Sequence, residues 1–194
     1  MRIRSNLYPN GEYLNDFFTT TLTTSTTTLP PVIISSINNP YGVNWGVWGP
    51  SEECDQNDYV IGFRTKLQPD QGAGDDTSIN GVELICSNGK RIKSSEGDFG
   101  SWDTVYRNCS NGQKINGFSY GIENKGSSDD TATNVIRLFC TGGYNITSLE
   151  GRWSTSIIKM SCPYGFIVGL RTQVQPFQNS ADETGLNNIE FICK

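Results

Sequence analysis

The stretch from Gly74 to Cys86, G-D-D-T-S-I-N-G-V-E-L-I-C, decides the fold, because the chain contains two further copies of it. The second copy, S-D-D-T-A-T-N-V-I-R-L-F-C, spans residues 128–140, and the third, A-D-E-T-G-L-N-N-I-E-F-I-C, spans residues 181–193. In every copy an acidic pair precedes Thr, Asn follows Thr by three residues, and Cys follows Asn by six. This common register indicates an internal threefold repeat.

The rest of each unit keeps the same period of 53 to 54 residues, measured between the cysteines that end the copies. A Trp lies two residues after a Gly in every unit, and these three Trp are interpreted as core residues. Apolar and polar residues alternate with period two before and after each polar loop, which predicts strands. The charged residue within each last strand is expected to face away from the core: Glu83, Arg137 and Glu190.

Repeats of this length with about four strands predict small sheets arranged around an axis. Three units are too few for a propeller, which begins at about four blades. The prediction is therefore an all-β fold, a β-prism in which three four-stranded sheets turn their apolar faces toward one core. The prism domain is predicted to span residues 32–194, with repeats at about 32–86, 87–140 and 141–194.

Residues 1–31 are predicted to be a disordered Thr/Ser-rich head. A run of Thr and Ser from Thr19 to Thr28, closed by Pro30 and Pro31, cannot bury apolar surface and is typical of an extended linker or an O-glycosylated stalk. Met1 to Phe18 contains no apolar run long enough for a signal peptide, so we expect the natural N-terminus to be longer or replaced.

The composition excludes several functions. A net charge of -5 argues against nucleic acid as a partner, and the absence of histidine removes Ser-His-Asp and Cys-His catalysis and His metal sites. No segment has the apolar length of a membrane span. Six cysteines without a CxxC pair predict disulfides in an oxidising, extracellular compartment. The threefold repeat favours pairing within each unit: Cys54 with Cys86, Cys109 with Cys140, and Cys162 with Cys193.

The acidic pairs admit two interpretations. As turn residues, their carboxylates would accept backbone N–H groups two residues on, with Thr and Asn adding similar bonds. As functional residues they are candidates for glycan contact, calcium binding or acid/base catalysis. Because active sites seldom occur three times in a chain, we expect no catalytic residue. A calcium-binding loop would usually offer more staggered carboxylates, so we expect no metal, and no cofactor is expected. The candidate glycan-binding residues are Asp75, Asp76, Asp129, Asp130, Asp182 and Glu183.

Two further sequence features concern the surface. Trp45 has no Trp counterpart in the other units, so it is the candidate for an exposed ring that stacks on a sugar. Asn108-Cys109-Ser110 and Asn145-Ile146-Thr147 are N-glycosylation sequons. We expect Asn145 to be modified in preference to Asn108, whose sequon has a cysteine in the middle.

The repeated D-D-T-x-x-N motif, the G-x-W before each first cysteine and the 53-residue period together make residues 32–194 similar to the vitelline membrane outer layer protein I family. The resemblance implies Greek-key sheets with pseudo-threefold symmetry, secretion, and a carbohydrate-associated cleft at one end of the prism. We therefore expect a secreted, non-enzymatic structural protein of an extracellular coat or mucus layer. Its expected partners are extracellular glycans or coat glycoproteins. The alternatives are a lectin-like module and, third, an enzyme acting on chito-oligosaccharides.

Overall fold

The structure is a computed structural model that describes residues 29–35, 44–124, 126, 129–179 and 182–194. In these ranges the chain forms β-strands, and its one helical element is the short turn η1 (Ser110–Gly112). The all-β prediction is confirmed. The Thr-rich run and the expected targeting segment lie outside the described residues. None of the described residues forms a helix long and apolar enough to cross a membrane.

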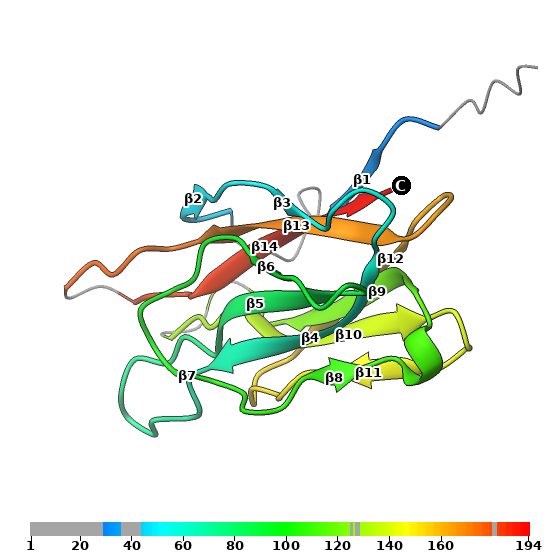
Figure 1. Ribbon diagram of the computed structural model, residues 1–194. Helices are drawn as coiled ribbons and strands as arrows, with labels where there is room; N and C mark the ends of the chain where they lie inside the picture. Colours follow the sequence, from blue (N-terminus) through cyan, green and yellow to red (C-terminus); the bar gives the residue numbers. More distant parts are fainter. Residues whose placement is uncertain (1–28, 36–43, 125, 127–128, 180–181) are drawn as a thin grey trace, which may run out of the picture.

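The strands form three antiparallel sheets around one core (Figure 1). Sheet A contains β1 (Val32–Ser35), β14 (Leu186–Cys193), β13 (Ile167–Val174), β2 (Val47–Trp48) and β3 (Glu52–Glu53). Sheet B contains β6 (Arg91–Lys93), β5 (Ile79–Cys86), β4 (Val60–Leu67), β7 (Ser101–Trp102) and β8 (Arg107–Asn108). Sheet C contains β11 (Asn145–Thr147), β10 (Thr133–Cys140), β9 (Ile115–Ile122) and β12 (Ser156–Ser161).

Each sheet is a Greek key built on a long hairpin. In sheet C the order β11-β10-β9-β12 places the fourth strand beside the first, and sheets A and B repeat this order. Two sheets have their outer strand divided into a pair of short pieces, β2 with β3 and β7 with β8. Sheet A combines the C-terminal hairpin with β1, β2 and β3 from the start of the domain, so its strands come from both ends of the repeat array.

The core lies where the inward faces of the three hairpins meet. Alternation along the strands sends every second side chain inward, so Phe118 and Tyr120 of β9 lie fully buried in the core while Ser119 between them lies on the outer face of the sheet, opposite Arg137. The ring of Phe118 packs against that of Phe191 in sheet A with 4.7 Å between centroids. Side chains from different sheets therefore form one contiguous cluster.

The three repeated Trp do not lie in this core, which corrects the prediction for them. Trp48 and Trp102 lie on the outermost strands and are only partly buried. Their rings stack outward on cations of the neighbouring strand, Trp48 under Arg171 (4.6 Å) and Trp102 under Arg64 (5.1 Å). Trp153, also partly buried, lies in the equivalent connection of sheet C. A Trp on an edge strand can bury part of its ring against a cation on the outer face of the sheet, so it needs no place in the core.

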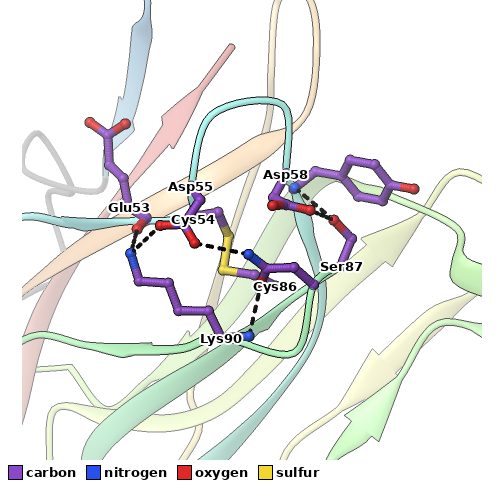
Figure 2. Close-up of a disulfide and its surroundings, with 9 residues drawn as sticks. Glu53, Cys54, Asp55, Asp58, Cys86, Ser87 and Lys90 are labelled. Carbon is purple, nitrogen blue, oxygen red and sulfur yellow. Dashed lines mark hydrogen bonds and ion pairs between the residues drawn. A yellow bond between two sulfur atoms is a disulfide. The ribbon is translucent and has the colours of Figure 1, made fainter.

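The three disulfides pair as the repeat predicts: Cys54–Cys86, Cys109–Cys140 and Cys162–Cys193. What the repeat does not predict is that each bridge joins two different sheets. Cys54 follows β3 of sheet A, whereas Cys86 ends β5 of sheet B. Figure 2 shows the polar contacts around this bridge, where Lys90 donates to the carboxylate of Asp55 (2.8 Å). The other two bridges connect sheet B to sheet C and sheet C to sheet A, so the three bridges close a ring at one end of the prism.

Candidate functional site

The repeated motif forms a turn at the prism end opposite the disulfides. The residue after the motif Thr adopts a positive φ in all three copies: Ser78 (53°), Ala132 (51°) and Gly185 (60°). This left-handed backbone turns the chain into the last strand of the hairpin. The buried Asn two residues later stabilises it, and in the first copy Asn80 donates to the hydroxyl of Thr77 (2.6 Å) and to the carbonyl of Ser78 (3.1 Å).

The first acidic residue of each copy connects one turn to the next. The backbone N–H of Asp76 donates to Asp129 (3.0 Å), that of Asp130 donates to Asp182 (3.1 Å), and that of Glu183 donates to Asp75 (3.3 Å). The three acceptor carboxylates lie around the pseudo-threefold axis with one oxygen of each within 4.8 Å of the others. We call Asp75, Asp129 and Asp182 the acidic ring. Its bonds link all three hairpins, whereas the sequence predicted bonds within one turn.

The second acidic residue of each copy is buried and holds the loop that precedes it. Asp76 accepts the backbone N–H of Gln71 (2.7 Å), and Glu183 accepts that of Gln178 (2.6 Å). Asp130 accepts the backbone N–H of Gly126 (3.1 Å) in the same way. Their side chains therefore shape the loops around the acidic ring.

The electrostatics of the ring favour protons. Partial desolvation, followed by the side-chain hydrogen bond and charge of Glu183, raises the pKa of Asp75 from 3.8 to about 7. Desolvation also raises the pKa of Asp182, although the backbone N–H of Asp130 opposes that shift. The pKa of Asp76 is raised by its burial and by the charges of Asp129 and Asp70. No cation contributes to these three shifts, so negative charge accumulates at this end of the prism as pH rises.

Folding should therefore become less favourable as Asp75 and Asp182 ionise. The folded pKa of Asp75 exceeds its unfolded value of 3.8. The contribution of this carboxyl to the free energy of unfolding is therefore complete below about pH 4 and is lost as pH rises through 7. Thermal unfolding of the parent, followed by circular dichroism, should give a higher Tm at pH 5 than at pH 8. Asp75→Asn keeps an acceptor oxygen but cannot ionise, so its Tm should exceed the parent's at pH 8 and converge on it only as the pH falls to about 4.

Asp58→Asn, at the disulfide end, removes the same charge far from the ring and is the matched control. Its Tm should vary with pH as the parent's does. Parallel curves for the parent and Asp75→Asn would show that the ring does not link stability to pH.

A shallow groove of about 680 Å³ adjoins the ring. It brings together Trp45, which is partly buried, and the ring residue Asp182, with amide side chains between them. Gly46 in its wall has φ of 87°, and a Cβ there would lie 2.2 Å from the carbonyl oxygen of Val174, so only glycine fits. The groove is lined by Asn44, Trp45, Gly46, Gln175, Pro176, Gln178 and Asp182.

Hydrogen bonds fix the groove's loop to sheet A. The Gln173 side chain donates to the carbonyl of Asn44 (3.3 Å) and to that of Gly46 (3.2 Å). Asn188 donates to the side-chain oxygen of Asn44 (2.9 Å). The indole of Trp45 therefore extends from a loop whose backbone is held by β13 and β14.

The structure divides the candidate glycan-binding residues into two groups. Trp45 and the acidic ring lie at the surface of the prism end, whereas Asp76, Asp130 and Glu183 are buried behind it, with 1%, 5% and 4% exposure. A ligand at this end would meet the first group directly.

Sequence reasoning missed a further element of each turn, a side-chain acceptor at the end of the hairpin's first strand. Gln68 accepts both the backbone N–H and the hydroxyl of Thr77, and Gln175 does the same for Thr184. Glu123 fills this position in the second unit. The sequence did contain a signal for this element. Gln68 and Gln175 each lie nine residues before the motif Thr of their unit, and each is followed directly by Pro.

The two sequon asparagines lie away from this end. Asn145 is exposed on edge strand β11 of sheet C, and Asn108 is exposed on β8 of sheet B, next to Cys109. Both positions are exposed, which is compatible with modification. Glycosylation at Asn145 and Asn108 stays a prediction.

The chemistry available at the ring is that of oxygen acceptors. Three carboxylate oxygens within 4.8 Å could together ligate a hard cation such as calcium. Each of them also accepts a backbone N–H, and Asp75 holds a proton over part of the neutral range. With the indole and amides of the neighbouring groove, the ring offers the stacking surface and hydrogen-bonding groups that polar ligands require.

Solved structures share the fold. Frutalin from Artocarpus incisa matches with a TM-score of 0.52 at 12% identity, over 87% of this chain and 99% of its own. The mannose-binding lectin from champedak matches with a TM-score of 0.53 at 12% identity, over 86% of this chain and 98% of its own. At this level of identity the likeness concerns the β-prism alone.

Sequence comparison identifies the relatives. The "Vitelline membrane outer layer protein 1 homolog" of Mus musculus is 31% identical over 173 residues, which cover 82% of this chain and 83% of the mouse protein. The family model for vitelline membrane outer layer protein I matches residues 35–194. The chain therefore belongs to the vitelline membrane outer layer protein I family.

Proposed function

We propose that this protein is a secreted, non-enzymatic component of an extracellular coat, and that it attaches to the coat by binding neutral glycans at the acidic-ring end of its prism. The observation that carries the proposal is the groove in which Trp45 and Asp182 lie together. A sugar presents an apolar ring face and a rim of hydroxyl donors. An indole beside amide and carboxylate acceptors complements both.

Four further observations support this assignment. The family name refers to an egg coat, and three inter-sheet disulfides suit a protein that persists outside the cell. Structural neighbours with the same prism include proteins described as lectins, one of them as mannose-binding. The ring carboxylates are already engaged as acceptors of backbone N–H groups, which favours binding over turnover.

The test is a binding measurement with neutral glycans. Mannose oligosaccharides and chito-oligosaccharides, titrated to millimolar concentration, should bind the oxidised full-length chain in isothermal titration calorimetry. Trp45→Ala should weaken the binding of the responsive sugar by about tenfold, because it removes a stacking contact of roughly 1 to 2 kcal/mol.

Trp48→Ala is the matched control, since Trp48 lies three residues away but stacks outward on Arg171. Its affinity should remain within a factor of about two of the parent's. Absence of binding to every neutral sugar at millimolar concentration would reject the proposed function. Equal losses in the two variants would reject the groove as the site.

A further inference from the structure

The three outer faces of the prism differ where an edge strand crosses the hairpin. In sheet B the outward residues of β6 are cations, with Lys93 opposite Glu83 and Arg91 opposite Ile85. The same register in sheet C carries neutral polar residues, Thr147 and Asn145. In sheet A it carries Ser35 and Ile33. Sheet B alone therefore departs from the threefold pattern by adding two cations at its edge.

These cations belong to a row of alternating charges and rings on the outer face of sheet B. The Lys93 ammonium lies 5.5 Å from the Trp102 centroid, and the Arg64 guanidinium lies 5.1 Å from that same centroid. Arg64 lies 5.0 Å from the Tyr106 centroid, and Arg91 lies 4.9 Å from it. We call Lys93, Trp102, Arg64, Tyr106 and Arg91 the cation–aromatic row. The rings hold the cations in place, so less rotamer entropy is lost when they bind an anion.

The acids of this face pair with two of the row's three cations. Glu83 pairs with Arg64 (2.6 Å) and its side chain is 13% exposed, so it lies beneath the row. Lys93 has a more exposed partner in Glu96 (3.2 Å). Arg91 is exposed and forms no ion pair among the described residues. Lys66, on the same face, donates to the carbonyl of Gly97 and adds a further positive charge.

We propose that the outer face of sheet B binds an anionic polysaccharide, one carrying sulfate or uronate groups, along the cation–aromatic row. Trp102 and Tyr106 each already lie against two of the protein's own cations, so the row recognises charge rather than a neutral sugar ring. Repeated anions of a polymer can engage the separate cations of the row together, which raises affinity through effective concentration.

Charge distribution favours this partner over nucleic acid. The chain has a net charge of -5, and its acidic ring lies on another part of the prism, so a long, densely charged duplex would be repelled outside the row. A flexible polysaccharide can follow one face alone. This inference goes beyond the proposed function, because it concerns a different surface and a charged class of glycan.

The test uses a size-defined heparin oligosaccharide as the probe, with unsulfated dextran oligomers as the neutral comparison. The oxidised full-length chain should bind heparin at low salt, and affinity should fall as salt increases because the contacts are electrostatic. Arg91→Gln with Lys93→Gln should weaken heparin binding roughly tenfold. Both side chains are exposed, so the double variant should retain its fold. Near-ultraviolet circular dichroism checks this.

Arg137→Gln with Lys159→Gln on sheet C is the matched control, because it removes two positive charges from an outer face without touching the row. It should change heparin affinity by less than about twofold. Equal weakening by both double variants, no heparin binding by the parent, or equal binding of DNA and anionic vesicles would overturn the proposal. Neutral-glycan binding at the groove should survive in Arg91→Gln/Lys93→Gln, so the two proposals fail separately.

Discussion

Replacing Cys109 and Cys140 together with alanine is expected to lower the free energy of unfolding by about 3 to 4 kcal/mol. The bridge closes a loop across a sequence separation of 31 residues, and a loop of that length gives this value in the chain-entropy description of disulfides. It also joins sheet B to sheet C, because Cys109 follows β8 and Cys140 ends β10. Without it, core packing and the chain connection through η1 remain to hold the two sheets together at that edge.

The measurement is urea unfolding of the double variant and of the parent, followed by Trp fluorescence. The matched variant removes Cys54 and Cys86, where the ion pair of Lys90 with Asp55 and its bond to the carbonyl of Glu53 persist (Figure 2). Because these contacts are exposed and screened by solvent, they are expected to offset only a small part of the loss. A loss below about 1 kcal/mol for the first variant would show that the bridge does not constrain the unfolded chain.

Replacing Phe118 with alanine is expected to cost about 3 to 5 kcal/mol of folding free energy, the range for deleting a buried aromatic side chain. Phe118 is fully buried, and its ring contacts Phe191 of another sheet (4.7 Å) and Tyr120 of its own strand (5.9 Å). The cavity would therefore open at the meeting point of two sheets, where neither can move inward alone.

Phe139→Ala is the control, because Phe139 lies in the adjacent strand β10 on the outer face, where Lys159 covers its ring (5.0 Å). Denaturant unfolding should show a loss of about 1 kcal/mol or less for this variant. Similar losses for the two variants would contradict the division between inner and outer faces.

Much of the fold could be predicted from the sequence, because the controlling information is periodic. The spacing of the cysteines predicted the three disulfides, and alternation along the long strands predicted which residues face inward. The same reasoning failed for Trp48 and Trp102. Size and apolarity indicated the core, but their position on short edge strands places them over cations instead.

The candidate site was predictable only in part. The sequence singled out Trp45 and the acidic pairs, but it assigned the carboxylates to bonds within their own turn. In the structure each ring carboxylate accepts an N–H from a different unit, as Asp75 does from Glu183, which lies 108 residues away in the chain. A contact between units depends on how the sheets close, and no local pattern encodes it.

The motif from Gly74 to Cys86 by itself determined the threefold repeat, the all-β class and the pairing of the cysteines, because these follow from spacing along one chain. Only the tertiary structure decided that the three acidic turns converge on one axis, that each disulfide connects two sheets, and that sheet B alone carries a row of cations. The physical reason is closure. A prism assembles residues from units more than fifty positions apart, and their proximity exists only once three apolar faces are buried against one another.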